Sequence, residues 1–492
     1  MSISVDFDGR PFHFIGVGGI GMSALAYVLV NKQLPVSGSD KHPNHITKRL
    51  ESIGVNIFDR QEANNLLFFR SPTYTNEVSL EKQVEIGNIE PRSIEQRMTP
   101  QVVCSTAINN NNSEYKAALE LGCPIFHRSD VLAALIALHH SIAVAGTHGK
   151  TTTSSLVGCM LLETGLDPTI IVGGEVNAWK GNARVGQSQY LVAEADESDG
   201  SLIKHSPRIG IITNIELDHP DHYETLEEVV DIFLKFSEQC EIVVGCNDCS
   251  TVRNRLKPTI SYSVHSNIDA DYSVTDIDYH AGGTTALVWE KGTVLGVLKL
   301  CLLGHHNLSN ALAAVAIGRN LGLEFEDIAK GLASFIGARR RFELRGEVNG
   351  ITFIDDYAHH PSEIRVTLAA AKLLLQPGER IVVVFQPHRY SRTLTFLYEF
   401  AESFAFADAV VITKIYSAGE ADLGLVSGEK LAKEISKHHK QVIYQPSLTN
   451  VCDCLLQTLC PGDLTLFLGA GNLNQVIPEV INTLRQPATA TS

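Results

Sequence analysis

A glycine-rich loop at residues 145–153, Ala-Gly-Thr-His-Gly-Lys-Thr-Thr-Thr, constrains the fold of this chain more than any other segment. The apolar residues before it predict a buried strand, and Lys150 and Thr151 stand where a helix is expected to begin. Backbone N–H groups at a helix start attract phosphate oxygens, a lysine adds a full charge, and a hydroxyl can bind Mg²⁺. The loop therefore predicts a nucleoside triphosphate site. The strict phosphate-loop pattern places glycine where Val144 stands, which leaves a chance glycine turn as the alternative.

Length and charge limit the classes of protein to which the chain can belong. Its 492 residues exceed what one hydrophobic core supports and predict roughly three domains. A formal charge of −15 disfavours nucleic acid and anionic lipid as partners, so a small phosphorylated ligand is the better expectation. The N-terminus carries Asp6 and Asp8 where a signal peptide needs basic and apolar residues, which predicts a cytoplasmic protein without a membrane span. The ten cysteines follow no disulfide spacing, in agreement with reduced thiols.

Strand and helix patterns alternate along most of the chain, which predicts the α/β class with parallel sheets. We expect strands at residues 12–15, 35–37, 102–103, 190–193, 209–213, 351–354, 381–385, 409–412 and 464–468, helices at 21–30 and 306–321, and a β-rich stretch at 261–303. The polar residues 64–100 lack periodicity and predict an insertion or long loop outside the sheets, and the tail 486–492 is expected to be disordered. Because ligands bind at the carboxyl ends of parallel strands, α/β units meeting over a shared cleft are the expected architecture.

A second glycine loop follows the first predicted strand. Gly16, Gly18 and Gly21 satisfy the G-x-G-x-x-G pattern, and Asp40 lies at about the distance of a ribose-binding acid. The pattern requires only a close approach of backbone to a diphosphate at a helix start, so a nicotinamide dinucleotide, a flavin and a UDP-linked sugar all fit it. Glycines that merely pack a helix on a strand are the remaining alternative.

Charged residues follow the predicted strands of the middle and last segments. Glu194 begins an acidic run, 194–199, and is expected to bind Mg²⁺ opposite Thr151, with His219 as a candidate second ligand. A solvated acidic loop and an ordinary histidine are the alternatives. Arg389 and Arg392 can present planar forks to a carboxylate. Because this pair and the run 355–361 both follow strands, a substrate site is favoured over surface salt bridges.

Taken in order, these motifs resemble those of the Mur ligase family over nearly the whole chain. The shared segments are residues 16–22, 37–40, 146–153, 194–199, 213–219, 306–311, 340–342, 355–361 and 388–393, and the shifted glycine is the family's usual loop form. The resemblance implies a Rossmann-like N-terminal domain for a UDP-linked substrate at 1–138, a central phosphate-loop ATPase domain at 139–335, and a C-terminal Rossmann-like α/β domain at 336–492 that closes over ATP and brings the amino acid. The chain departs from the family pattern in two places. One is the long polar insertion, and the other is the sequence at 109–113, which stands where the family typically has Asp-Asn-Pro-Glu.

The resemblance also implies an activity. It implies a ligase of peptidoglycan precursor synthesis that uses ATP and Mg²⁺ to join L-alanine to the lactyl carboxylate of UDP-N-acetylmuramate through an acyl phosphate. The run 388–393 favours L-alanine over the preformed peptide that a sister ligase attaches. A dehydrogenase would leave the phosphate loop unused, and a nucleotide-gated regulator would not need the arginine pair. The protein is expected to act on these small molecules as a monomer or homodimer.

Site residues are carried over from the family by position. ATP is expected at Gly146, Thr147, His148, Gly149, Lys150, Thr151, Thr152, His306, Asn310, Arg341 and Asp356, and Mg²⁺ at Thr151, Glu194 and His219. The UDP-linked substrate and L-alanine are expected at Gly16, Gly18, Gly19, Gly21, Met22, Ser39, Asp40, Ser105, Tyr357, His360, Arg389 and Arg392. The expected catalytic residues are Lys150, His359, His360, Arg389 and Arg392. The acceptor of the amine proton is left open between His359 and His360, and no lysine stands out as the carbamylated metal ligand of several related ligases.

Overall fold

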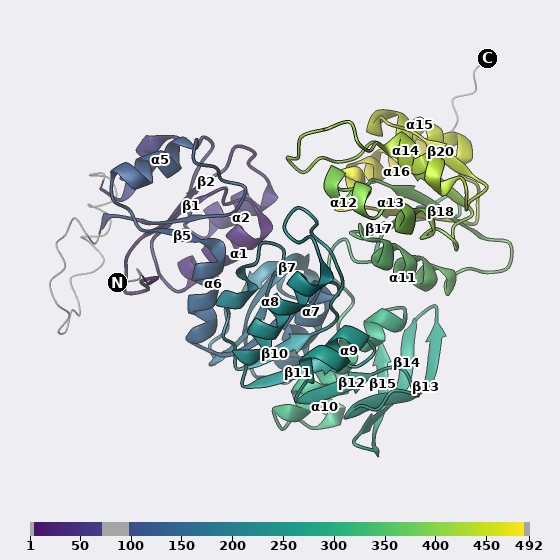
Figure 1. Cartoon of the computed structure of the whole chain (residues 1–492), viewed down its shortest axis with the longest axis horizontal. Coiled ribbons are helices and arrows are strands. Elements are labelled where there is room, and N and C mark those ends of the chain that lie inside the picture. Colours follow the sequence, from purple (N-terminus) through teal and green to yellow (C-terminus); the bar gives the residue numbers. More distant parts are fainter. Residues whose placement is uncertain (1–3, 71–97, 487–492) are drawn as a thin grey trace.

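The structure is a computed structural model that describes residues 4–70 and 98–486. It forms three lobes, each built on its own β-sheet (Figure 1). The N-terminal lobe, purple to blue, and the C-terminal lobe, green to yellow, both lie beside the teal middle lobe. The α/β class and the three-part organisation expected from the alternating pattern are confirmed.

Five parallel strands form the N-terminal sheet, in the order β3-β2-β1-β4-β5. The strands are β1 (Phe12–Ile15), β2 (Val36–Ser39), β3 (Asn56–Phe58), β4 (Gln101–Cys104) and β5 (Ile125–His127), and the helices are α1 (Ile20–Asn31), α2 (His45–Ser52), α5 (Ser113–Glu120) and α6 (Arg128–Ala137). Strand β1 pairs with β2 on one side and β4 on the other, so the strand order reverses there. The glycine loop after β1 therefore lies at the switch point, where ligands bind in such sheets.

The first residues of the predicted polar insertion are folded. Ala63–Arg70 forms a 3-10 helix in which Leu66 and Phe69 are buried. Leu66 packs with Ile15 and Val102 of the neighbouring strands. The expectation of a loop is wrong for this stretch, because two apolar side chains anchor it outside the sheet. The rest of the insertion, residues 71–97, and the tail 487–492 lie outside the described residues.

Ten strands form the middle sheet, in the order β15-β14-β13-β12-β11-β10-β6-β9-β7-β8. They are β6 (His140–Ala145), β7 (Thr169–Val176), β8 (Gly181–Arg184), β9 (Tyr190–Glu194), β10 (Ile209–Ile212), β11 (Ile242–Cys246), β12 (Ile260–Ser263), β13 (Tyr272–His280), β14 (Gly283–Glu290) and β15 (Thr293–Leu300). The helices are α7 (Lys150–Glu163), α8 (Leu226–Glu238), α9 (His305–Asn320) and α10 (Phe325–Ala333). The phosphate-loop strand β6 lies between β9 and β10, so acidic residues at the ends of both neighbours lie beside the loop.

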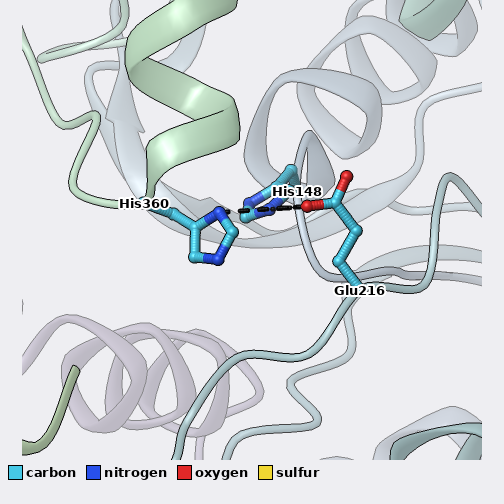
Figure 2. Close-up of side chains that lie close together, drawn as sticks. All are labelled: His148, Glu216 and His360. Carbon is cyan, nitrogen blue, oxygen red and sulfur yellow. Dashed lines mark ion pairs between the residues drawn. The ribbon is translucent and has the colours of Figure 1, made fainter. Parts of the chain in front are cut away.

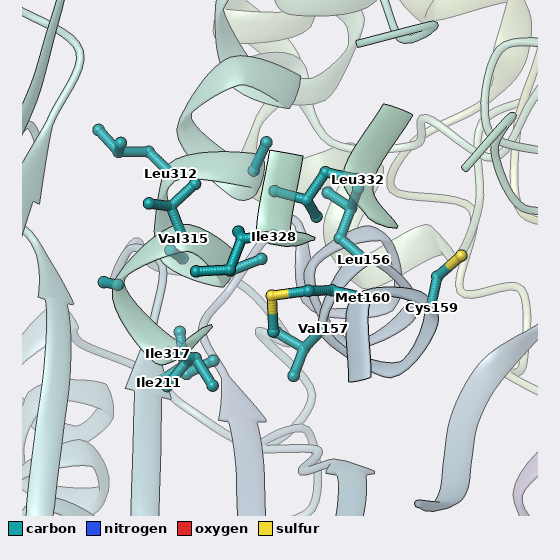
Figure 3. Packing of buried hydrophobic residues seen from close by; sticks show 14 of the residues in the cluster. Leu156, Val157, Cys159, Met160, Ile211, Leu312, Val315, Ile317, Ile328 and Leu332 are labelled. Atoms are coloured by element: carbon teal, nitrogen blue, oxygen red, sulfur yellow. The ribbon is translucent and has the colours of Figure 1, made fainter. Parts of the chain in front are cut away.

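The core of the middle lobe fixes helix α7 behind the phosphate loop. Met160 of α7 packs beside Ile328 of α10 (Figure 3). A Cβ atom on Gly318 of α9 would lie 2.6 Å from Ile328 and 2.9 Å from the Met160 sulfur, so only glycine permits this approach of the helices. The start of α7 is therefore held rigidly at the edge of the sheet.

Six strands form the C-terminal sheet, in the order β16-β17-β21-β18-β19-β20. They are β16 (Glu343–Val348), β17 (Ile351–Asp356), β18 (Arg380–Phe385), β19 (Ala409–Ile412), β20 (Val442–Tyr444) and β21 (Asp463–Leu468); only β16 is antiparallel to its neighbour. The helices are α11 (Pro361–Lys372), α12 (Tyr390–Thr395), α13 (Leu397–Ala401), α14 (Gly428–Ile435), α15 (Leu448–Thr458) and α16 (Val476–Arg485). The histidine and arginine motifs follow β17 and β18, as expected.

The lobes are joined in two different ways. One apolar cluster contains Leu25 of α1, Leu135 of α6 and Phe233 of α8, so the N-terminal and middle lobes share a core. The Asn182 side chain of β8 also donates to the Ile20 carbonyl and the Ser23 hydroxyl of α1. Contacts between the middle and C-terminal lobes are mainly polar, for example the hydrogen bond from Ser362 to Glu216 at 2.7 Å.

No helix in the described part of the chain is both long and apolar enough to cross a membrane. The domain boundaries at 138/139 and 335/336 stay predictions.

Candidate active site

A cavity of about 1070 Å³ opens where the three lobes meet. Its walls contain the start of α1, the phosphate loop, the segments after β9 and β10, and the loops after β17 and β18. The expected site residues that line it are Gly19, Gly21, Met22, Ser105, Thr147, His148, Gly149, Lys150, Thr151, Glu194, His219, Arg341, Tyr357, His359, Arg389 and Arg392. Motifs as far apart in the sequence as those of Gly19 and Arg392 therefore face one space.

The phosphate loop has the backbone that its glycines predict. Gly146 has φ +137° and Gly149 has φ +84°, in the region that favours glycine. A Cβ atom on Gly149 would lie 2.7 Å from the Asn310 side-chain oxygen. Helix α7 begins at Lys150 with no side-chain cap, so its first N–H groups are available to an anion.

Lys150 is held in the loop by a buried carboxylate that the sequence did not single out. Its Nζ donates to the Gly146 carbonyl at 2.7 Å and to Glu197 Oε1 at 2.9 Å. Burial opposes the charge, but Glu197 outweighs burial and raises the pKa of Lys150. The Glu197 side chain is only 2 % exposed. Lys150 is therefore charged and held in position. A bound phosphate would compete with Glu197 for its ammonium group.

The oxygen donors beside the loop fit a divalent cation. Thr151 Oγ1 lies 3.1 Å from Glu194 Oε1, and Glu194 Oε2 accepts the Gly173 N–H at 2.7 Å. Burial raises the pKa of Glu194, a cost that a cation would relieve. His219 Nε2 lies 3.7 Å from both Glu197 Oε1 and Asp218 Oδ2. Hydroxyl and carboxylate oxygens are ligands that Mg²⁺ prefers, so Thr151 and Glu194 are the better placed of the expected ligands.

Some of the residues expected to bind substrate in the N-terminal lobe stabilise the glycine loop and do not line the cavity. Asp40 Oδ2 accepts the Gly18 N–H at 2.8 Å. The Ser39 hydroxyl is buried and donates to Glu114 Oε2 at 2.5 Å. Gly16, Gly18, Ser39 and Asp40 are absent from the described cavity wall, whereas Gly19, Gly21, Met22 and Ser105 belong to it. Helix α1 lacks a side-chain cap, so this loop also offers free N–H groups.

Both arginines of the expected amino-acid site line the cavity, and both have carboxylate partners. Arg392 Nε donates to Asp218 Oδ1 at 2.7 Å, and its Nη1 donates to His388 Nδ1 at 3.2 Å. Burial opposes ionisation of Asp218, but Arg392 outweighs burial and holds the pKa of that carboxyl well below its usual range. Arg389 pairs with Asp221 and with Glu420 at 3.3 Å. The pair is thus held in place by Asp218 and Asp221 of the middle lobe and by Glu420 of the C-terminal lobe.

Several expected residues lie outside the cavity wall. Asp356 accepts the Phe342 and Ala358 N–H groups, each at 2.7 Å, and burial raises its pKa to about 6. Asn310 accepts from Thr153 Oγ1 at 3.1 Å, directly behind Gly149. Thr152 and His306 do not line the cavity either. Asp356 and Asn310 support the loops that line it, as does His360, which caps the start of α11.

A charged cluster links the phosphate loop to the C-terminal lobe, and its carboxylates were not predicted as site residues. His148 Nδ1 lies 3.2 Å from Glu363 Oε1, and His148 Nε2 lies 3.4 Å from Glu216 Oε2. Burial opposes the charge, but the two carboxylates raise the pKa of His148 to about 10. His148 lowers the pKa of Glu216 to about 2 against the effect of burial. His148 is therefore an imidazolium between carboxylates of two lobes.

The same cluster has the composition of a metal site. Ligand atoms of His148, Glu216 and His360 lie within 4.8 Å of one another (Figure 2). However, His360 Nδ1 accepts the Ser362 N–H at 3.3 Å, and both nitrogens of a charged His148 carry protons. The ion pairs explain the cluster without a metal. Glu216 lies inside the run 213–219 and Glu363 three residues after the cap of α11, which are the only sequence signals that pointed to them.

Comparison with known proteins agrees with this geometry. The chain matches the Mur ligase family, catalytic domain at residues 11–140, the Mur ligase middle domain at 144–318, and the Mur ligase, glutamate ligase domain at 340–471. A UDP-N-acetylmuramate–L-alanine ligase of Nostoc punctiforme is 72% identical over 492 residues, and the match covers 100% of both chains. One from Gloeothece citriformis is 61% identical, over 98% of this chain and 99% of the relative.

Solved structures give the same result. The UDP-N-acetylmuramate-alanine ligase MurC of Thermotoga maritima has a TM-score of 0.77 and 28% identity, with 96% of this chain and 98% of that chain covered. A murein peptide ligase of Psychrobacter arcticus has a TM-score of 0.67 at 22% identity, over 98% of this chain and 100% of that chain, which is a likeness of fold alone. A phosphate loop and a second glycine loop that face a common cavity fit two phosphorylated substrates, and the curated relatives place the chain among ATP-dependent ligases. The chain belongs to the Mur ligase family.

Proposed function

We propose that this enzyme joins L-alanine to the lactyl carboxylate of UDP-N-acetylmuramate, with ATP as the energy source, in the synthesis of peptidoglycan precursors. The observation that supports this most directly is the single cavity into which two uncapped helix starts and an arginine pair open. Each helix start suits one phosphorylated substrate, and the arginines suit the carboxylate of an amino acid. The high identity to curated L-alanine ligases over the whole chain supports the choice of amino acid.

The first step activates a carboxylate. Its oxygen attacks the γ-phosphorus of ATP, the bond between that phosphorus and the β-γ bridging oxygen breaks, and ADP leaves. Lys150 and the N–H groups at the start of α7 would stabilise the charge on the transferring phosphoryl group, so Lys150 must exchange Glu197 for phosphate oxygens. Thr151 and Glu194 would hold Mg²⁺, which supplies charge neutralisation when it is bound.

The second step forms the amide bond. The amine of L-alanine attacks the acyl carbon, the C–N bond forms, and the C–O bond to phosphate breaks. Arg389 and Arg392 are placed to bind the alanine carboxylate and so to orient the amine. Arg341, whose Nη2 lies 3.4 Å from Thr151 Oγ1, brings a further charge from the C-terminal lobe to the triphosphate site. Contacts of this kind between lobes would exclude water from the acyl phosphate.

An assay of ADP release tests the proposal. Purified protein receives ATP, Mg²⁺ and UDP-N-acetylmuramate with L-alanine, glycine, L-serine or the tripeptide that a peptide ligase would attach. We expect ADP release to require both co-substrates and to be fastest with L-alanine. Equal or faster release with the tripeptide would favour the sister ligase, and no release with any amine would refute the proposed activity. A cytoplasmic location and a monomeric or dimeric state remain part of the proposal.

A further inference from the structure

Amide formation needs a group that takes a proton from the ammonium of L-alanine, and this inference, which rests on the proposed function, concerns that group. Four histidines surround the Asp218–Arg392 pair: His219, His359, His360 and His388. A neutral imidazole can accept a proton only at the ring nitrogen that carries no hydrogen. The hydrogen-bond partners of each ring therefore decide which of them can act.

Three of the four histidines are unsuited. His388 Nδ1 accepts from Arg392, which only donates, so its hydrogen is on Nε2. His360 Nδ1 accepts the Ser362 N–H, and its Nε2 is buried outside the cavity wall. His219 Nε2 lies 3.7 Å from both Glu197 Oε1 and Asp218 Oδ2, and the residue is an expected magnesium ligand, so its Nε2 already faces other groups.

His359 has the opposite arrangement. Its Nδ1 lies 2.9 Å from the Tyr357 carbonyl and 3.2 Å from Glu363 Oε2, and both of these atoms only accept. Nδ1 must therefore carry the hydrogen. Burial lowers the pKa of His359 to about 4, so the ring is neutral and Nε2 has its lone pair. The residue lines the cavity, and Nε2 has no hydrogen-bond partner among the described residues.

Glu363 is fixed more firmly than the histidine that it orients. Its Oε2 accepts the backbone N–H of His359 at 2.9 Å and that of His360 at 3.2 Å, which completes the capping box of α11. Its Oε1 lies 3.2 Å from His148 Nδ1 in the phosphate loop. One carboxylate therefore contacts the loop for ATP through one oxygen and the histidine beside the amine through the other.

We propose that Glu363 is a positioning residue that, together with the Tyr357 carbonyl, holds His359 in the tautomer whose Nε2 accepts the amine proton. In the reaction, the ammonium nitrogen of L-alanine gives a proton to Nε2 and its freed electron pair forms the C–N bond. The newly bonded nitrogen then loses its second proton to the leaving phosphate or to solvent, inorganic phosphate leaves with the electrons of the C–O bond, and the imidazolium passes its own proton to solvent. The other oxygen of the Glu363 carboxylate contacts His148, so the position of His359 is linked to that of the phosphate loop.

The first test compares two amines. Hydroxylamine is largely unprotonated at neutral pH and needs no base to attack an acyl phosphate, whereas L-alanine must lose a proton. We expect Glu363→Gln and His359→Gln to lower kcat with L-alanine about 10²-fold, the typical contribution of a general base, and to keep hydroxamate formation within threefold of wild type. Glutamine at position 363 can also complete the capping box, so Glu363→Gln preserves the start of α11.

The second test varies pH and does not depend on hydroxylamine. The charged groups around the His359 ring are Glu363 on α11, Asp218 after β10 and Arg392 after β18, and the titratable His388 ring beside it is neutral. Because alkaline solution deprotonates the free amine, we expect the deficit of both variants with L-alanine to shrink as pH rises from 7 to 9.5. A merely structural defect would be constant over this range.

Glu228→Gln is the matched control, since Glu228 completes the capping box of α8 far from the cavity. It should behave as wild type with both amines. The proposal is overturned if the Glu363 and His359 variants lose both amines equally at every pH, or if they keep wild-type turnover of L-alanine. Failure of the proposed function itself would be visible in the wild-type enzyme, which would then release no ADP with any amine.

Discussion

The two glycine loops of this protein share a local design and differ in their charge. Each follows a parallel strand, each leads into a helix without a side-chain cap, and each opens into the same cavity. The phosphate loop carries Lys150 and His148, each held by buried or half-buried carboxylates. The N-terminal loop carries no charged side chain between Gly16 and Met22, and its one acid, Asp40, is bound to the Gly18 N–H. Charge thus separates the loop proposed to hold the triphosphate of ATP from the loop proposed to bind the diphosphate of the sugar nucleotide.

The largest expected effect comes from removing the charge of the phosphate loop. Lys150→Ala should lower kcat for ADP formation by about 10³-fold, because a preorganised charge on the transferring group is lost. It should also lower the melting temperature, since the buried Glu197 carboxylate then keeps, among the described residues, only His219 as a charged partner, at 3.7 Å. Lys116→Ala, an exposed lysine on α5, is the control. Near-normal turnover in Lys150→Ala would contradict the difference drawn between the loops.

Arg389 and Arg392 are expected to bind the amino acid and neither of the phosphorylated substrates. Their variants therefore test whether the effects assigned to the two glycine loops are specific. Arg392→Ala should lower kcat/KM for L-alanine about 10²-fold, the usual result of removing one partner of a buried charged hydrogen bond. Affinities for ATP and for UDP-N-acetylmuramate should change less than threefold in binding titrations. Arg392→Lys should be intermediate, because it keeps the charge and loses the fork. Unchanged dependence on L-alanine in Arg392→Ala and in Arg389→Ala would remove the amino-acid site from this position.

A smaller effect is expected from a purely steric change in the N-terminal loop. A Cβ atom on Gly18 would lie 2.7 Å from Asp40 Oδ2, so Gly18→Ala must displace the acid that braces the loop. We expect KM for UDP-N-acetylmuramate to rise roughly tenfold, with KM for ATP unchanged, as for a small misplacement of a binding group. A larger effect on ATP than on the sugar nucleotide would show that the two loops are not separate in function.

The smallest effect concerns pH. The pKa of His148 is about 10 in the folded protein and near 6.5 when unfolded, so its contribution to stability is complete below pH 6.5 and is lost as pH rises towards 10. The melting temperature should fall by a few degrees over that range. In Glu216→Gln the fall should be shallower, because one carboxylate partner of His148 is gone. An equal fall in both proteins would mean that the cluster does not hold a proton between the lobes.

The sequence predicted what depends on neighbouring residues. The strands at 12–15, 190–193, 351–354 and 381–385 and the helix starts after both glycine loops form where apolar runs and glycines place them. It did not predict β8, whose residues Gly-Asn-Ala-Arg have no strand pattern and which is formed by pairing with β7. The 3-10 helix at 63–70 was also missed, because its short apolar run at 66–69 was counted as part of the polar insertion.

Contacts between residues far apart in the sequence could not be predicted, for a physical reason. His148 and Glu363 are 215 positions apart, and only the assembled lobes bring them to 3.2 Å. The same is true of Arg392 and Asp218, 174 positions apart. Residue types and their order indicated which side chains face the cavity, but the counter-ions that set their charge follow from tertiary packing. Glu197, Glu216 and Glu363 belong to this second group.

The unequal interfaces between the lobes have a consequence for motion. Separating the N-terminal lobe from the middle lobe would expose shared apolar surface to water at a large free-energy cost, whereas separating the C-terminal lobe would mainly break polar contacts, such as the Ser362–Glu216 hydrogen bond and the buried Arg392–Asp218 pair, whose groups water or substrate can then solvate. The first two lobes are therefore expected to travel as one rigid body, and the C-terminal lobe to rotate against it during turnover. Substrates would enter and ADP would leave by that rotation alone.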